Sequence, residues 1–187
     1  MYFGLAHFLN FDTHLIDRIR QKYDPTVDLI APHITVLFPI HDTIKKSVLA
    51  THINKILKNW PPFQIHICGL CKSWDHWLLL GIEEGNAEVK DLYHEIYSGP
   101  LVTYKRDDID FIPHISLGLF AKQSSSYDYT NPKELIFDKH SYDNALREAE
   151  SLNLNYNSVF DKLNLVILSD DFSKIDKGEN FFLNEKY

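Results

Sequence analysis

The chain has 187 residues, of which 44% are hydrophobic and 24% charged, and its formal net charge is −7. This composition is typical of a globular protein rather than a disordered one, and the acidic charge argues against a protein that coats long double-stranded nucleic acid. No apolar run is long enough to span a bilayer, and residues 1–4 lack the basic start of a secretory signal. We therefore expect a cytoplasmic protein without a membrane partner.

The beginning of the chain predicts a strand, a helix and a second strand. Residues 2–9 are rich in apolar and aromatic residues, as strands are. Asp12 or Thr13 can cap the helix that follows, and a proline ends it. Residues 33–38 predict the next strand, which we expect to end at Pro39.

The middle of the chain continues this alternation. Apolar residues at helical spacing predict a helix at about 44–59, which two prolines stop. Strands are expected near 63–70 and 76–83. A further helix opens near Asn86 and closes at Gly99.

The last part predicts two main strands, a helix and a loop. A strand is expected at about 111–120, followed by a polar surface loop over 123–131. A helix near 141–152 leads into a strand at about 158–168, and residues 181–183 add a short edge strand. Strands and helices interleave without the rhythm of long βαβ units, so the pattern favours an α+β fold.

One short motif occurs twice, as Pro-His-Ile-Thr and as Pro-His-Ile-Ser. A strand places residues i and i+2 on the same face, so His33 shares a face with Thr35, and His114 shares one with Ser116. The apolar residues between them point the opposite way, into a core. Each strand thus presents an imidazole beside a hydroxyl.

Two imidazoles and two hydroxyls, brought together across a cleft, suit a phosphodiester. Each hydroxyl can donate a hydrogen bond to a non-bridging oxygen, and a histidine can lie on either side of phosphorus. One neutral imidazole can accept a proton while a charged one donates. We therefore predict a shared catalytic role for His33 and His114, with no metal and no cofactor. The other histidines are interpreted as structural: His7, His14, His41, His52, His66, His76, His94 and His140.

Two other patterns have competing interpretations. The spacing H-x-C-x2-C-x4-H could supply four zinc ligands, namely His66, Cys68, Cys71 and His76. The alternation of residues 63–68 is also typical of a strand, which we favour over zinc. Phe120 has the same strand parity as His114 and could stack a base, although packing in the core or at its rim is favoured.

At its two motifs the chain resembles the two-histidine (2H) phosphoesterases, which include 2′-5′ RNA ligase-like proteins and cyclic nucleotide phosphodiesterases. The signature of that superfamily is a pair of H-x-[T/S]-x motifs, and here they are His33-Ile34-Thr35-Val36 and His114-Ile115-Ser116-Leu117. A proline precedes each motif, at Pro32 and Pro113. In this feature the chain resembles the bacterial 2′-5′ RNA ligase branch.

The resemblance implies a bilobal α+β domain over residues 1–187. Two antiparallel sheets flanked by helices would enclose a V-shaped cleft between pseudo-duplicated lobes. It also implies a hydrolase that acts on 2′,3′-cyclic phosphates or cleaves and joins 2′-5′ linkages. His33 and His114 would be acid and base, in either order, with Thr35 and Ser116 as phosphate contacts.

The expected partner is a nucleotide or short oligonucleotide with a cyclic phosphate or a 2′-5′ linkage. No arginine closely follows either motif, and only Lys122 follows the second at some distance. With the acidic net charge, this favours small cyclic nucleotides or short oligomers over long RNA. We expect a monomer. The alternative function is a non-catalytic module that binds a phosphate or an RNA end in the same cleft.

Overall fold

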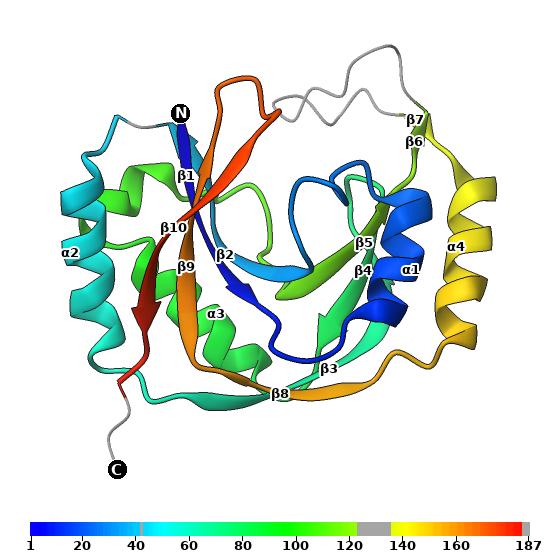
Figure 1. Ribbon diagram of the computed structural model, residues 1–187, viewed down its shortest axis with the longest axis horizontal. Coiled ribbons are helices and arrows are strands. Elements are labelled where there is room, and N and C mark those ends of the chain that lie inside the picture. Colours follow the sequence, from blue (N-terminus) through cyan, green and yellow to red (C-terminus); the bar gives the residue numbers. More distant parts are fainter. Residues whose placement is uncertain (42, 123–135, 185–187) are drawn as a thin grey trace.

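The structure, a computed structural model, describes residues 1–41, 43–122 and 136–184. Its first sheet has four antiparallel strands in the order β10-β9-β1-β2 (Figure 1). The strands of this sheet are β1 (Tyr2–Phe8), β2 (His33–His41), β9 (Lys162–Leu168) and β10 (Ile175–Phe182). The strand that carries His33 is therefore an edge strand.

The second sheet also has four antiparallel strands, in the order β5-β4-β3-β8. Its strands are β3 (Phe63–Lys72), β4 (Trp77–Ile82), β5 (His114–Leu119) and β8 (Tyr156–Phe160). The strand that carries His114 is again at the edge. Each sheet thus has its histidine strand in the same place, which agrees with the predicted pseudo-duplication.

The described part of the chain forms four α-helices, which lie on the outer sides of the two sheets (Figure 1). They are α1 (His14–Tyr23), α2 (Lys46–Leu57), α3 (Asn86–Ile96) and α4 (Lys139–Ser151). Helix α2 contacts β10 and α3 contacts β2, whereas α1 contacts β5 and α4 contacts β3 and β4. Helix α1 follows a strand of the first sheet but packs on the second, and α3 does the reverse. This exchange ties the two sheets together.

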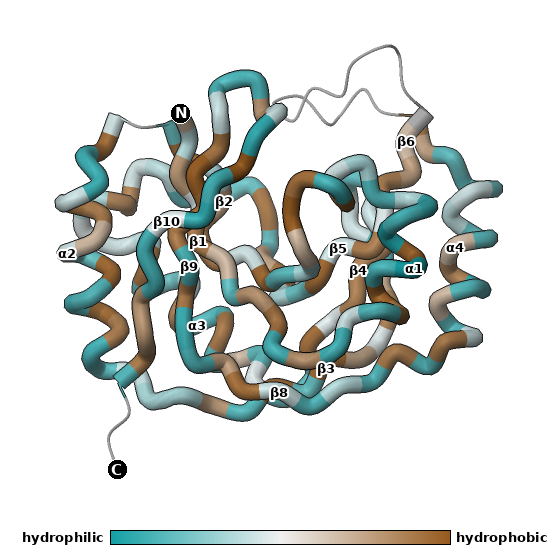
Figure 2. Tube along the Cα trace, viewed as in Figure 1, coloured by the Kyte–Doolittle hydropathy of each residue, from teal (hydrophilic) through white to brown (hydrophobic). Residues whose placement is uncertain are grey.

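One apolar cluster fills the space between the sheets and their helices. It combines Leu5, Ile34 and Leu165 of the first sheet with Ile67 and Ile115 of the second, all at most 1% exposed. Burial of these side chains is the main force that holds the helices to the sheets. Figure 2 shows hydrophilic and hydrophobic residues alternating along α2 and α4, as expected of helices with one buried face. We call the opposite side of each sheet, which turns away from these helices, its inner face.

The predicted α+β fold of two antiparallel sheets flanked by helices is confirmed, but several boundaries differ. The prediction of a single strand at 158–168 is wrong, because the strand is interrupted at Asp161 and two separate strands form. Strand β8 pairs with β3 in the second sheet, and β9 pairs with β1 in the first. This segment therefore crosses from one sheet to the other, which an apolar pattern cannot reveal.

The predicted stop at Pro39 is also wrong, since β2 continues to His41. Proline lacks an N–H donor but is tolerated on an edge strand, where one side of the backbone has no strand partner. Strand β5 begins at His114 rather than at 111. Further short elements were not predicted: β6 (Ala121–Lys122), β7 (Ile136–Phe137) and a 3-10 helix (Gly99–Tyr104).

The loop predicted over 123–131 falls outside the described residues. Within the part of the chain that is described, no helix is long and apolar enough to cross a membrane.

Candidate active site

Each motif histidine lies at the start of an edge strand, one in each sheet. His33 is the first residue of β2 and His114 is the first residue of β5. These strands lie side by side in the centre of the molecule (Figure 1), although they belong to different sheets. The charge of His114 contributes to lowering the pKa of His33, so the two rings are within electrostatic reach of each other.

Burial alternates along both motifs as the sequence predicts. Ile34 and Ile115 are fully buried, whereas His33 and His114 are partly exposed. Thr35 and Ser116 are likewise partly exposed, and therefore share the inner face with the imidazoles. Each histidine is thus next to a hydroxyl on the same face.

The same hydrogen bond holds both imidazoles. The Nδ1–H of His33 donates to the Ala31 carbonyl at 2.8 Å, and that of His114 donates to the Ile112 carbonyl at 2.5 Å. A carbonyl cannot donate, so Nδ1 must carry the proton and Nε2 of a neutral ring keeps its lone pair. Both rings therefore present Nε2 to a ligand.

The hydrogen bonds of the two histidines explain why a proline precedes each of them. Pro32 and Pro113 are buried, and each follows a residue whose carbonyl accepts the histidine proton. A residue that precedes proline is restricted to extended backbone conformations. The proline thus fixes the carbonyl that orients the ring two residues later.

The hydroxyls of Thr35 and Ser116 are available to a ligand. Among residues 1–41, 43–122 and 136–184, neither hydroxyl has a hydrogen-bond partner. Each can donate to an oxygen of a bound phosphate.

The surroundings disfavour the charged form of both imidazoles. Desolvation lowers the pKa of His33 to about 4, and the positive charges of Arg20 and His114 add to this shift. The Ala31 carbonyl and the Asp24 carboxylate oppose it. Desolvation also lowers the pKa of His114, against the opposing effects of the Ile112 carbonyl and the Asp75 carboxylate. Both rings are therefore mostly neutral at pH 7 until an anion binds beside them.

A buried ion pair supports the segment that leads into His33. Arg20 and Asp24 have side chains only 2% and 1% exposed, and the Arg20 Nε donates to Asp24 Oδ2 at 2.8 Å. Arg20 Nη2 also donates to the Ile30 carbonyl, and the other Asp24 oxygen accepts from the N–H and the hydroxyl of Thr26. The pair therefore ties α1 to the turn before β2.

The sequence did not single out Phe8 and Lys177. The ring of Phe8 lies 5.7 Å from that of His33, and the Lys177 ammonium lies 4.2 Å above the Phe8 ring. Phe8 pairs with His33 across β1 and β2, so it shares the inner face. Lys177 could not be placed near Phe8 without the sheet order, because it is distant in the chain.

Other sequence hypotheses fall on different parts of the structure. Phe120 is 2% exposed and packs against Tyr23 and Tyr142, so it belongs to the core and does not stack a base. The four residues of the less favoured zinc interpretation do not all lie together: among the described residues, the group that does is His66, Cys68 and Glu83. Cys71 is exposed and the His76 ring packs against Phe137.

The comparison with known families agrees with this geometry. A model of the 2′-5′ RNA ligase superfamily matches residues 9–139, which include both histidine motifs. The chain belongs to this superfamily. The expected relationship to the 2H phosphoesterases is thereby confirmed.

Similar bacterial proteins carry provisional names as phosphoesterases. One, from Halalkalibacterium halodurans, is 27% identical over 133 residues, which is 68% of this chain and 73% of that protein. Another, from Bacillus cereus strain B4264, is 30% identical over 104 residues, which is 54% of this chain and 58% of that protein.

Several solved structures share this fold at low sequence identity. LigT of Escherichia coli superposes with a TM-score of 0.60 at 15% identity, over 98% of both chains. TT0787 of Thermus thermophilus gives 0.60 at 13% identity, over 98% of both chains. Usb1 of Kluyveromyces marxianus gives 0.55 at 13% identity, over 94% of this chain and 96% of that one.

Proposed function

We propose that this protein is a metal-independent phosphoesterase that opens 2′,3′-cyclic phosphates or cleaves 2′-5′ linkages of nucleotides or short RNA. The observation that carries the proposal is the matched pair of Nδ1 hydrogen bonds, which leaves two Nε2 atoms on adjoining strands. Structures of LigT with 3′-AMP and of Usb1 with uridine monophosphate support a nucleotide as the ligand class.

The charges around the two histidines suggest which is base and which is acid. The positive charge of Arg20 disfavours a charged His33 more than the Asp24 carboxylate favours it, whereas Asp75 favours a positive charge on His114. Neutral His33 would remove a proton from the attacking water through Nε2. As the bond from phosphorus to the 3′ oxygen breaks, Nε2–H of charged His114 would protonate that oxygen. The products would be a free 3′ hydroxyl and a 2′-phosphate.

Neighbouring groups would hold the phosphate and the nucleoside. The hydroxyls of Thr35 and Ser116 would donate to its non-bridging oxygens. The Lys177 ammonium adds a positive charge on the His33 side, and Phe8 offers an aromatic surface. The net charge of −7 favours a small ligand bound by these local groups over a long polyanion.

The proposal predicts hydrolysis of nucleoside 2′,3′-cyclic phosphates in excess EDTA. The rate should rise as the pH falls from 8 toward 5, because His114 becomes charged, and fall again near the pKa of about 4 at which His33 is protonated. Product analysis by phosphorus NMR distinguishes the 2′- from the 3′-phosphate. Tight binding of a 2′-nucleotide without turnover of any cyclic or 2′-5′ substrate would instead establish the non-catalytic binding module.

A further inference from the structure

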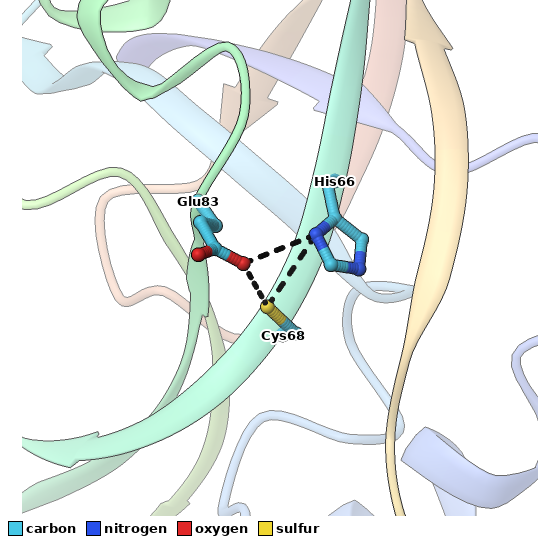
Figure 3. A group of neighbouring side chains, drawn as sticks. All are labelled: His66, Cys68 and Glu83. Carbon is cyan, nitrogen blue, oxygen red and sulfur yellow. Dashed lines mark hydrogen bonds and ion pairs between the residues drawn. The ribbon is translucent and has the colours of Figure 1, made fainter.

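A second cluster of reactive side chains lies on the second sheet, away from the histidine pair. His66 and Cys68 of β3 meet Glu83, which follows β4 (Figure 3). One ligand atom of each lies within 4.8 Å of the others. The proposed phosphoesterase mechanism uses none of them.

The backbone of the two strands brings these side chains together. His66 and Cys68 are two residues apart on one strand, so they share a face. The Glu83 N–H donates to the His66 carbonyl at 2.8 Å, which places the carboxylate beside the imidazole. The register of β3 and β4 shifts after Ile67, and Gly69 has a φ of 79°. Such a bulge re-aims side chains locally.

A further hydrogen bond fixes the tautomer of His66. Its Nε2–H donates to the Asn155 side-chain oxygen at 3.0 Å. The lone pair of the neutral ring is therefore on Nδ1, which faces Glu83 Oε2 at 3.2 Å and Cys68 Sγ at 3.7 Å. Metal-binding histidines commonly use one nitrogen for the ion and donate the other N–H to such an oxygen.

The separations of the three ligand atoms lie within about 0.4 Å of those around a tetrahedral zinc ion. Typical zinc bonds to sulfur, nitrogen and oxygen imply ligand separations of about 3.4 to 3.6 Å. The observed separations are 3.7 Å for sulfur to nitrogen, 3.2 Å for nitrogen to oxygen and 3.2 Å for sulfur to oxygen. We propose that His66, Cys68 and Glu83 bind one zinc ion, with water as the fourth ligand.

A thiol nucleophile is the competing interpretation, since Cys68, His66 and Asn155 form a chain of contacts like a catalytic triad. The Glu83 carboxylate argues against it. Cys68 Sγ donates to Glu83 Oε2 at 3.2 Å, so the thiol lies beside a negative charge. A nucleophilic cysteine needs positive neighbours that lower its pKa. A negative neighbour instead suits a cation, which would replace the thiol proton.

The zinc site lies on the inner face, apart from the histidine pair. Gly81 of β4 pairs with His114 of β5, and a Cβ added to Gly81 would come within 3.2 Å of the Cys68 carbonyl. Strand β4 lies between β3 and β5, so the cluster is roughly 10 Å from His114 by the usual strand spacing. Zinc binding should therefore not depend on His33 or His114.

Binding can be measured on the reduced, metal-free full chain by competition with a chromophoric zinc chelator. We expect one zinc per chain, and one proton released from the Cys68 thiol, seen by calorimetry in buffers of different ionisation enthalpy. Cobalt in place of zinc should show thiolate-to-metal charge transfer. Cys68→Ser should abolish that absorption and weaken zinc binding by at least about 100-fold, since losing even an outer partner costs 10- to 100-fold.

Matched variants separate this site from others. Cys71→Ser and Glu84→Gln change residues of the same type that lie outside the cluster, and both should bind zinc like the unmodified chain. Glu83→Gln should weaken binding, and the double variant His33→Ala/His114→Ala should retain it. Unfolding curves of the metal-free variants check that each is folded.

The proposal is overturned if the unmodified chain binds no zinc, or if Cys68→Ser binds it as tightly as the unmodified chain. It is also overturned if Cys71→Ser loses cobalt charge transfer, or if the double histidine variant loses zinc, because the ion would then be held elsewhere.

Discussion

Replacing either His33 or His114 with alanine is expected to lower kcat/KM for a nucleoside 2′,3′-cyclic phosphate by about 100- to 10,000-fold, the usual contribution of a general acid or base. Each ring supplies one of the two proton transfers. His33 and His114 are the first residues of β2 and β5, and no other described side chain occupies either position. Steady-state assays in EDTA measure the loss.

The fold should survive these changes, because both side chains are only partly buried. The thermal midpoint should therefore stay within a few degrees of that of the unmodified chain. His94→Ala is the matched control, since His94 is exposed on α3, and it should keep full activity. The double variant should lose little more than either single variant, as expected of residues that act together. Retention of activity within tenfold in either single variant would contradict the mechanism.

Replacing Asp24 with alanine is expected to lower the free energy of unfolding by about 3 to 5 kcal/mol, because it removes the closer and more deeply buried of the two carboxylates that pair with the buried Arg20 guanidinium. Asp17, 3.5 Å from Arg20 Nη1, remains as the other partner. The change also removes two hydrogen bonds to Thr26, in the turn that leads to β2. Urea unfolding followed by circular dichroism measures the effect.

Two further variants test whether the effect comes from the ion pair. Asp28→Ala changes an exposed carboxylate in the same turn and should stay within about 0.5 kcal/mol of the unmodified chain. Arg20→Met combined with Asp24→Leu removes both charges, and should be more stable than Asp24→Ala alone. A cost below about 1 kcal/mol for Asp24→Ala would show that the pair contributes little to the fold.

Much of this architecture could be predicted from local patterns. Apolar and aromatic content placed β1, period-two alternation placed β3, and helical spacing placed the α-helices of the described residues, because each of these helices buries one side. The repeated Pro-His-Ile-hydroxyl motif pointed to His33 and His114 because it combines strand parity with an imidazole. The reason for the proline became clear only from the hydrogen bonds to the preceding carbonyls.

Features that depend on pairing between distant segments could not be predicted. The interruption of the predicted strand at Asp161 follows from β8 and β9 pairing in different sheets. The nearness of Lys177 to Phe8 depends on the order of strands in the first sheet. The spacing of His66, Cys68, Cys71 and His76 suggested four zinc ligands, but the bulge and the register of β3 and β4 bring Glu83 to the first two instead.

The charged neighbours of the two histidines could not be predicted from the sequence either. Arg20 and Asp24 have the spacing of a helical ion pair, but nothing in the sequence shows that both side chains are buried. Asp75 precedes β4 and reaches His114 only through the fold. The assignment of His33 as base and His114 as acid depends on these neighbours.

The central claim is that His33 and His114 converge on one bound anion, and nitrogen NMR of the two imidazoles tests it most directly. In the free protein both rings should titrate below the ordinary pKa of 6.5, with His33 near 4. Addition of a nucleoside 2′-phosphate should raise both pKa values together and shift both Nε2 resonances, while both Nδ1 atoms stay protonated. A ligand that shifts one ring and leaves the other unchanged would contradict the account.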